Sequence, residues 1–531
     1  MAEQKLKKLP LGLSDFKKII DGDYVYVDKT QLIYELIAGG DYYFLSRPRR
    51  FGKSLLISTL EELFSGNKKL FENLWIGKSG YTWPVYPIIH FDFSSISNLS
   101  VQELRQDIID TIEEIAITYA IDVPKQQTIA GKFKALIKQL ATINQVVILI
   151  DEYDKPILDH IDNLDEAKAQ RAVLKSLYTA IKGSDRYIKF LLLTGVSKFA
   201  KTSIFSGINN LRDITLSKQY ATLLGYTHQE LTDNFADYLE KQVPEIGDTV
   251  PAVIKNMQQQ YDGYQFFQNS ELVFNPYSVL TSFTENALGN YWFATGTPTF
   301  LITLMKTSTY PLNRIYQPIM SADELDGFEP NDIKITALLY QTGYLTIKDY
   351  NKNSKGYTLD FPNYEVASAF NLLVSTSFTQ LTGDQTKTYA AQIAQAFAQK
   401  NMVELQNILQ SFFNEMPYNV HIKREFDLQI IIFSVFKLIG IEVDSEVVTS
   451  LAVPAEAFSE GWGRADLVVS LPKLVYVIEL KFNKTAQEAL SQIQDKKYYE
   501  KYLNSGKKIT LLGINFDEPT KTVSLESNSV Q

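Results

Sequence analysis

The chain contains no cysteine and only four histidines among its 531 residues. Disulfide bonds, thiol catalysis and zinc sites with cysteine ligands are therefore excluded. A histidine-rich metal site is not expected either, because so few histidines are present.

Long apolar runs are also absent. The longest ones, residues 146–150 and 190–193, have the length of a strand, whereas a helix that crosses a bilayer needs about 20 apolar residues. Residues 1–10 lack the apolar centre of a signal peptide. The sequence therefore predicts a cytoplasmic protein that does not enter a membrane.

Positive charge is in short supply as well. The formal net charge is −9, so no overall basic field attracts nucleic acid, and any such contact needs a local basic surface. Apolar and aromatic residues are plentiful: 45% of the chain is hydrophobic, and Tyr and Phe number 31 each. Well-filled cores are expected, and the length of the chain predicts roughly two to four domains.

A polar loop between two apolar segments carries Gly52-Lys53-Ser54. Residues 42–46 predict a buried strand, and residues 54–64 show the apolar period of a helix. In a P-loop of pattern G-x-x-x-x-G-K-[ST], backbone N–H groups at such a junction surround phosphate oxygens. The lysine reaches the terminal phosphates and the hydroxyl residue binds Mg²⁺. The position of the first glycine is arginine here, so the motif is degenerate.

The candidate ATP-binding residues of this loop form one continuous run. They are Arg49, Arg50, Phe51, Gly52, Lys53, Ser54 and Leu55, with Ser54 as the Mg²⁺ ligand. Arg47, at the position of the missing glycine, is expected to add positive charge to the loop together with Arg49 and Arg50. A lone Gly-Lys-Ser is common, so the context of the loop decides whether it holds a nucleotide.

That context is predicted at the ends of two further strands. Residues 146–150 form a fully apolar run, as expected for a parallel strand covered on both faces, and Asp151 and Glu152 follow it. In a Walker B motif, Asp151 would hold Mg²⁺ through water and Glu152 would orient or deprotonate the attacking water. Thr194, in the buried strand at 187–195, is a candidate contact of the γ-phosphate. The alternative is that an acidic pair and a threonine simply end two strands.

Residues 223–385 are rich in helical and turn patterns. A helix at 332–344, followed by two strands on either side of a polar turn at 351–356, predicts a winged-helix-like element. Such an element can bind DNA or act as a lid over a nucleotide site, and the sequence does not decide between them. The polar stretch 381–387 is predicted to be a linker.

The last third carries a second set of charged residues, in the predicted order helix (421–439), three strands (441–448, 465–470 and 474–482), helix (485–503) and strand (508–516). Asp466 lies in one strand, and Glu479 and Lys481 share one face of the next, because strand side chains alternate. If the hairpin folds symmetrically about Pro472 and Lys473, Asp466 lies opposite Glu479, and two carboxylates that close need a counter-ion. Mg²⁺ would serve, with Lys481 stabilising phosphate charge during phosphodiester hydrolysis.

A solvated strand face is the alternative, in which Lys481 only pairs with Asp466 and Glu479. The apolar residues around Glu479 argue against it, because they predict a central, covered strand. Seven lysines beside the hairpin offer a modest basic surface for nucleic acid, although such lysines are usually only solvated. They are Lys473, Lys484, Lys496, Lys497, Lys501, Lys507 and Lys508.

Three phrases of the sequence, at residues 44–56, 150–154 and 193–199, resemble the bacterial AAA-ATPase-like family that carries a PD-(D/E)XK nuclease domain at its C-terminus. Residues 203–211 extend the resemblance, which covers most of residues 8–220. An arginine-rich loop is usual in that family, so the missing first glycine is less exceptional than the general motif suggests. The resemblance implies P-loop NTPase ancestry.

Residues 415–516 resemble the nuclease core of the same family. The matching residues are Asp466, Glu479 and Lys481 for the catalytic triad, Glu425 for the helix carboxylate and Gln492 for the polar residue of the following helix. Tyr498 and Tyr502 also match the family pattern, and we assign them only packing or substrate contact.

We therefore predict an α/β protein with three regions. Residues 1–222 form a P-loop NTPase domain, a parallel sheet with helices on both faces; residues 223–385 form a helical and winged-helix-like lid; residues 386–531 form a restriction-endonuclease-like domain with its core at 415–516. The predicted function is an ATPase module coupled to a Mg²⁺-dependent nuclease acting on DNA or RNA. The alternative is a nucleotide-dependent switch, or a defence or signalling scaffold, in which the nuclease fold only binds. The sequence leaves homo-oligomer formation open.

Overall fold

The structure is a computed structural model that describes residues 6–123, 128–161, 163–199, 208, 210–292, 302, 306, 315–325, 327, 334–438, 442–448 and 464–530. The chain forms two compact units. The first consists of Met1–Thr297 and Gln317–Val366, and the second of Pro298–Tyr316 and Ala367–Gln531. The domain boundaries after residues 222 and 385 stay predictions. No helix in the described ranges is both long and apolar enough to cross a membrane.

The first unit contains a five-stranded parallel sheet in the order β2-β3-β4-β1-β5. Its strands are β1 (Tyr42–Ser46), β2 (Ile88–Asp92), β3 (Val146–Asp151), β4 (Ile188–Gly195) and β5 (Arg212–Asp213). Every residue of β1 and β3 is buried, so the sheet is covered on both faces, as the apolar runs predict. Because β1 lies between β4 and β5, the loop that follows β1 lies beside the end of β4.

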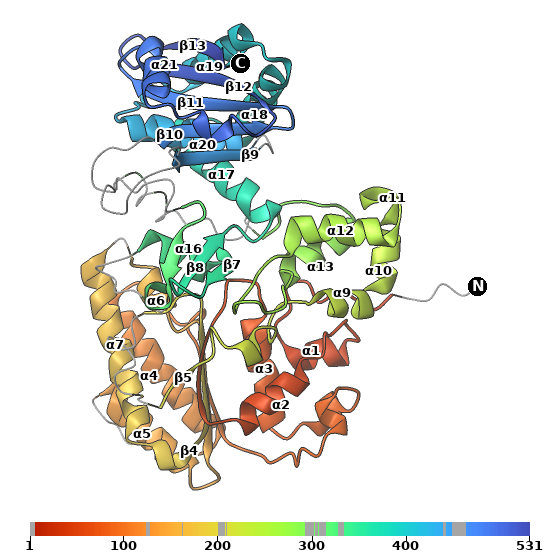
Figure 1. Cartoon of the computed structure of the whole chain (residues 1–531). Coiled ribbons are helices and arrows are strands. Elements are labelled where there is room, and N and C mark those ends of the chain that lie inside the picture. The colour runs from red at the N-terminus through yellow and green to blue at the C-terminus, as the bar shows by residue number, and fades with distance from the viewer. Residues whose placement is uncertain are drawn as a thin grey trace. The chain divides into compact units, whose positions relative to one another are not determined.

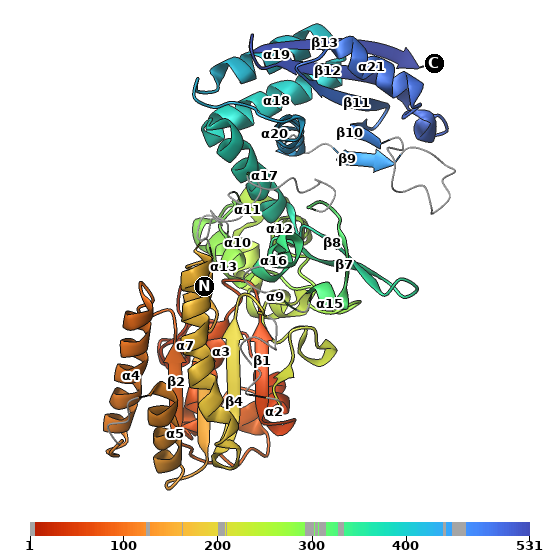
Figure 2. The ribbon, with the colours of Figure 1, turned by 90° about the vertical axis from the view of Figure 1, so that its left-hand side faces the viewer.

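Helices cover both faces of this sheet (Figure 1). On one side lie α4 (Val101–Thr118), α5 (Ile129–Leu140) and α7 (Leu164–Lys182); on the other lie α2 (Thr30–Ala38) and α3 (Lys53–Phe64), with α1 (Phe16–Asp21) packed on α3. Figure 2 shows α4, α5 and α7 together from a second direction. Ser100, Thr128 and Asn163 begin these last three helices, because each side chain accepts a hydrogen bond from a backbone N–H of the first turn.

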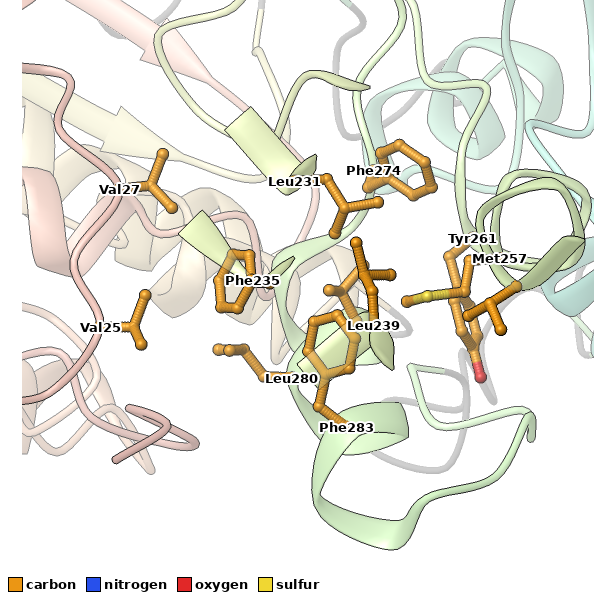
Figure 3. Close-up of a cluster of buried hydrophobic side chains, with 12 residues drawn as sticks. Val25, Val27, Leu231, Phe235, Leu239, Met257, Tyr261, Phe274, Leu280 and Phe283 are labelled. Carbon is orange, nitrogen blue, oxygen red and sulfur yellow. The ribbon is translucent and has the colours of Figure 1, made fainter. Parts of the chain in front are cut away.

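A group of short helices follows the sheet in the chain. They are α9 (His228–Asn234), α10 (Ala236–Lys241), α11 (Val243–Ile246), α12 (Val250–Tyr261) and α13 (Pro276–Glu285). Their buried side chains form one cluster with Val25 and Val27 of the N-terminal segment (Figure 3). Within it, the rings of Phe235 and Phe283 stack with 5.2 Å between centroids. This cluster therefore contains residues from both sides of the predicted boundary after residue 222.

The winged-helix-like element consists of one helix and a small antiparallel sheet. Helix α16 (Ile335–Thr342) precedes β7 (Thr346–Asn351) and β8 (Gly356–Asp360), and β6 (Ile319–Ser321) adds a third strand in the order β6-β8-β7. The predicted helix and hairpin are confirmed. The helix ends two residues earlier than predicted, because Gly343 adopts φ +91° and leaves the helical region.

The second unit is built on a mixed five-stranded sheet in the order β13-β12-β11-β10-β9. Its strands are β9 (Glu442–Val448), β10 (Arg464–Leu471), β11 (Leu474–Phe482), β12 (Lys508–Asp517) and β13 (Thr522–Val530), and only β11 and β12 pair in parallel. Helix α20 (Glu425–Leu438) packs against β9 and β11, and α21 (Ala486–Asp495) connects β11 to β12 and packs on both. The predicted order of helix, three strands, helix and strand is confirmed, and β13 extends it.

Two predictions for this unit are wrong. Residues 381–387 are not a linker: Thr382 caps α18 (Gly383–Gln399) in a reciprocal pair with Gln385, so a stretch with turn composition is the start of a helix. The helix predicted at 485–503 ends at Asp495, because Lys497 adopts φ +52° and the chain continues as the short turn Glu500–Tyr502. Helix α19 (Met402–Glu415) follows α18, and α17 (Tyr364–Thr379) precedes it.

Candidate nucleotide and nuclease sites

The loop after β1 turns into α3 at Gly52. Its φ of +95° lies in the left-handed region that favours glycine, and Arg50 also lies there, with φ +68°. Lys53 is the first residue of α3 and is buried. Its Nζ donates to the carbonyl oxygens of Arg47 at 3.0 Å and Pro48 at 3.1 Å. The lysine side chain therefore connects the end of the loop to the backbone at its start.

Arg47 has a different role from the one expected. Its side chain is only 1% exposed, and its guanidinium donates to the carbonyl oxygens of Ser46, Thr215 and Tyr220 at 2.9, 2.8 and 3.2 Å. The guanidinium also lies 4.0 Å from the ring centroid of Phe266. Burial lowers the pKa of Arg47 to about 10. The expectation that Arg47 adds positive charge to the phosphate side of the loop is therefore corrected: it fastens the start of the loop to neighbouring backbone.

The other side chains of the loop lie at its surface or against aromatic residues. Arg49 and Arg50 are exposed, and the guanidinium of Arg50 lies 4.6 Å from the ring centroid of Tyr277. The indole Nε1 of Trp292 donates to the carbonyl oxygen of Arg49 at 3.0 Å. Phe51 is buried. Two exposed arginines thus provide the positive charge at this loop.

The predicted acidic and polar partners lie at the same edge of the sheet. Thr194 Oγ1 donates to Asp151 Oδ1, which also accepts the backbone N–H of Glu152 at 3.0 Å. Asp151 is only 3% exposed. Burial raises the pKa of Glu152, and the charge of Lys53 opposes this shift. Burial lowers the pKa of Lys53, and the charges of Asp151 and Glu152 oppose that shift. The structure therefore brings all four groups together.

Two further acids belong to this edge and were not singled out from the sequence. Asp92, the last residue of β2, is the register partner of Asp151. Asp154 is buried and accepts hydrogen bonds from the backbone N–H of Val196 at 3.1 Å and from the N–H and Oγ of Ser197 at 2.6 and 2.7 Å. Asp154 thereby ties the segment after β3 to the segment after β4.

An apolar pocket lies beside the loop and the first turn of α3. Segments from four parts of the chain line it, including Val25, Val27, Phe51, Gly52, Leu55, Tyr226 and Pro276. Ser54, in the same turn as Leu55, is exposed. The hydroxyl of Ser54 and the carboxylate of Asp151 are hard oxygen donors of the kind that Mg²⁺ prefers. The residues present therefore fit a nucleotide with its metal ion.

The second site lies where β10, β11, α20 and α21 meet. Asp466 Oδ2 accepts the backbone N–H of Leu480 at 2.8 Å, and Glu479 Oε1 accepts Lys481 Nζ at 2.9 Å. Gln492 Nε2 also donates to Glu479 Oε1. Glu479 and Lys481 are only 2% and 7% exposed. The alternative of a solvated strand face is therefore wrong.

The predicted hairpin register is confirmed for the part that pairs. Leu471 pairs with Leu474 and Leu467 with Ile478, which is the symmetry expected about Pro472 and Lys473. The pairing of β10 with β11 ends at Leu467, and the carboxylate of the preceding residue, Asp466, accepts the backbone N–H of Leu480. Gly463, which precedes β10, lies outside the described residues.

Charge is concentrated and poorly solvated at this site. Burial raises the pKa of Asp466 well above its usual range, and the charge of Glu479 raises it further. Burial also raises the pKa of Glu479, which the hydrogen bond from Lys481 opposes. Burial lowers the pKa of Lys481, but the hydrogen bond and charge of Glu479 outweigh burial, so that this pKa is raised. Glu425, in the first turn of α20, acts on all three by its charge.

These carboxylates fit a divalent cation. Within the part of the chain that the structure describes, Glu479 Oε2 is buried without a hydrogen-bond partner, and such an atom is costly unless a cation or donor meets it. Among the described residues, no group of three or more His, Asp or Glu is arranged to hold a metal ion. Two carboxylates are nevertheless enough for Mg²⁺, which keeps several waters and accepts phosphate oxygens as further ligands.

Two further polar side chains lie at the second site. Gln429 of α20 donates from Nε2 to Asp466 Oδ1 at 2.8 Å, and no motif of the sequence includes it. Tyr498, buried beside the site, is 3.2 Å from Gln492 Nε2 through its hydroxyl. The structure thus gathers Asp466, Glu479, Lys481 and Gln492 as predicted, and the chemical roles of these residues remain predictions.

The two units define the class of the protein. A parallel sheet of order β2-β3-β4-β1-β5 with a lysine loop after β1 is the α/β architecture of P-loop NTPases, and the mixed sheet of the second unit with its carboxylates and lysine is nuclease-like. Residues 10–205 match the family model described as "Predicted AAA-ATPase", and residues 423–526 match that of the "PD-(D/E)XK nuclease superfamily".

A relative matches the chain over nearly its whole length. The chain is 35% identical to the "Uncharacterized protein in vnfD 5'region" of Azotobacter chroococcum mcd 1, over 97% of this chain and 98% of that protein. The chain therefore belongs to the AAA-ATPase-like family with a C-terminal PD-(D/E)XK nuclease superfamily domain. This confirms the resemblance inferred from the sequence. Of the extension at residues 203–211, most lies outside the described residues.

Proposed function

We propose that the chain binds ATP in the first unit and hydrolyses phosphodiester bonds of nucleic acid, with Mg²⁺, in the second. The observation that carries the nuclease proposal is the half-buried Asp466 beside the buried pair Glu479 and Lys481 of a central strand. Two carboxylates in a poorly solvated site repel each other, so the arrangement favours a bound cation. A cytoplasmic location, predicted from the sequence, accords with these substrates.

In the proposed nuclease, Asp466 and Glu479 would hold Mg²⁺, which supplies charge neutralisation and a more acidic water when bound. Gln492 and Lys481 both donate to Glu479 Oε1 and hold that carboxylate in place. Lys481, with its ammonium beside Glu479, is placed to stabilise negative charge on a phosphate. Glu425 adds a third negative charge near the site.

Exposed lysines of the second unit support nucleic acid as the partner, although Lys473 and Lys508 lie at the turn end of β11 and β12, away from Glu479. Six of the seven lysines named from the sequence are exposed, and Lys507 is half-buried. Phosphate contacts by exposed lysines give affinity without sequence preference. DNA and RNA are both compatible with this surface.

In the proposed ATPase, the phosphates would lie at the loop and at the start of α3. Lys53 would reach the terminal phosphates, and Ser54 and Asp151 would hold Mg²⁺, Asp151 through water. Glu152 would orient the attacking water and Thr194 would contact the γ-phosphate. The apolar pocket lined by Phe51 and Leu55 would take the base, while Arg49 and Arg50 contribute positive charge.

The nuclease proposal is tested by cleavage of DNA and RNA with Mg²⁺. Asp466→Ala is expected to lower the cleavage rate more strongly than the loss of a residue that only supports a metal ligand. That loss typically costs roughly 10–100-fold. Lys481→Ala is expected to lower it by roughly 10²–10³-fold, because a group that stabilises developing charge is lost. Asp495→Ala, at an exposed acid of the same domain, is the control. Equal cleavage by all four proteins would overturn the assignment.

The nucleotide proposal is tested by ATP binding to wild type and Lys53→Ala. Loss of a charge-assisted hydrogen bond predicts roughly 10–100-fold weaker binding. The control is Lys69→Ala, at an exposed lysine away from the loop. Unchanged affinity in the loop variant would show that the loop is not the phosphate site.

A nucleotide-dependent switch without hydrolysis is the second candidate. One observation favours it: the residue in place of the first P-loop glycine, Arg47, fills its site with its own side chain and backbone contacts. This candidate predicts ATP binding without turnover and no cleavage by the second unit. A steady-state phosphate-release assay on wild type separates it from the ATPase.

A further inference from the structure

Gln429 occupies a place in the second site that no sequence motif marks. It lies on α20, one turn after Glu425, and side chains four residues apart lie on the same face of a helix. Its Nε2 donates to Asp466 Oδ1 at 2.8 Å, while Leu480 N donates to Oδ2 of the same carboxylate at 2.8 Å. Asp466 is therefore held at both oxygens, by a helix on one side and by the neighbouring strand on the other.

The two carboxylates of the site are held differently. Glu479 accepts hydrogen bonds from Lys481 and Gln492 at Oε1, and among the described residues its Oε2 is buried without a hydrogen-bond partner. Asp466 has one neutral donor at each oxygen, and each carboxylate oxygen has a second lone pair that stays available. The orientation of Asp466 toward Glu479 thus depends on the amide of Gln429 and the backbone of Leu480.

The chemistry of the amide group matters here. An NH₂ group donates without adding charge, so it fixes the carboxylate and leaves the negative charge for a cation. A lysine or arginine at the same place would neutralise Asp466, and a carboxylate would repel it. Loss of a group that orients a metal-binding side chain in this way commonly weakens metal binding by roughly 10–100-fold.

We propose that Gln429 is a positioning residue of the nuclease site, holding Asp466 in the orientation in which it and Glu479 share one divalent cation. This rests on the proposed nuclease function. Gln429 does not reach the substrate in this scheme; it acts through Asp466. Its loss therefore weakens the cation site and leaves the nucleotide site of the first unit unchanged.

The test uses the full chain and Gln429→Met, which keeps the length of the side chain and removes the donor. Mn²⁺ binding is measured by calorimetry, and cleavage is measured against Mg²⁺ concentration. We expect Mn²⁺ to bind roughly 10–100-fold more weakly, the half-saturating Mg²⁺ concentration to rise by a similar factor, and saturating Mg²⁺ to restore most of the rate. The KM for nucleic acid and the affinity for ATP stay as in wild type. Gln487→Met, at an exposed glutamine of α21, is the matched control.

Each outcome separates the inference from the function on which it rests. A lower rate at every Mg²⁺ concentration, with unchanged half-saturation and unchanged Mn²⁺ affinity, assigns Gln429 a merely structural part and overturns the inference. Wild type that neither binds Mn²⁺ nor cleaves overturns the proposed nuclease itself. If Gln429→Met does not fold, Gln429→Leu, which also removes the donor and favours helix, replaces it, with the same expected shift and the same overturning result.

Discussion

Glu365 is a buried carboxylate whose pKa burial raises from 4.5 to about 7. Its two oxygens accept the backbone N–H of Trp292 at 2.6 Å and the hydroxyl of Ser278 at 2.8 Å. A carboxyl group with a higher pKa in the folded state binds its proton more tightly there than in the unfolded state. Its stabilising contribution is therefore present below pH 4.5 and is lost as pH rises to about 7.

Glu365→Gln is expected to remove this pH dependence, because an amide does not ionise. Between pH 5 and pH 7, the wild type should lose about 2 kcal/mol of unfolding free energy relative to the variant. Urea unfolding of both proteins at the two pH values measures the difference. Glu240→Gln, at an exposed glutamate, should show no such change, and equal slopes for wild type and Glu365→Gln would contradict the prediction.

At the residue scale, the sequence predicted side chains that belong to a local motif. Gly52, Lys53 and Asp151 stand at fixed distances from a strand end, so their position in the chain determines their position in the fold. Arg47 and Gln429 depend instead on partners that are distant in sequence: Thr215 is 168 residues from Arg47, and Asp466 is 37 residues from Gln429. Nothing local predicts which carbonyl or carboxylate such a side chain meets.

At the scale of the element, the apolar pattern of the sequence predicted the strands whose bounds are determined by burial. The buried strands Tyr42–Ser46 and Leu474–Phe482 have the predicted bounds. The strand Thr522–Val530 was missed, because it is half exposed and mostly polar, and its pairing with β12 defines it rather than its own pattern. The stretch predicted as a linker shows the converse: the residues that favour a turn also favour a helix cap.

The helical group of the first unit gives the prediction at this scale. Phe283 of α13 is buried and stacks on Phe235 of the segment between α9 and α10 (Figure 3). Its ring centroid also lies 5.5 Å from that of Tyr238. Phe283→Ala removes one ring from a core shared by several short helices, and short helices are stable mainly through packing. We expect a loss of about 3–5 kcal/mol in unfolding free energy, measured by urea titration. A loss below about 1 kcal/mol would show that the cluster does not hold these helices together.

At the scale of the whole molecule, the chain passes between the two units after residues 297, 316 and 366. Helix α17 spans the last of these points, so its first residues belong to the first unit and the rest to the second. Glu365 lies in its first turn. The hydrogen bonds between Glu365 and Trp292, and between Trp292 and the backbone of Arg49, join the start of this helix to the loop that follows β1. Sequence patterns predicted both domains. They did not predict this path of hydrogen bonds, because the residues that form it lie far apart in the chain.

If ATP controls the proposed nuclease along this path, Trp292→Phe should weaken the control and spare the sites. The variant keeps an aromatic ring and loses the indole donor to Arg49, a hydrogen bond that contributes about 0.5–1.5 kcal/mol. ATP affinity should therefore change by less than roughly 10-fold. The ratio of cleavage rates with and without ATP should fall toward one.

Measuring ATP binding and cleavage on the same preparations separates the two effects, with Trp75→Phe, at a partly exposed tryptophan, as the control. A wild-type ratio retained in Trp292→Phe would place the coupling elsewhere in the chain. If the cleavage rate of the wild type were the same with and without ATP, the two modules would act independently, since Lys53→Ala would then alter ATP binding alone.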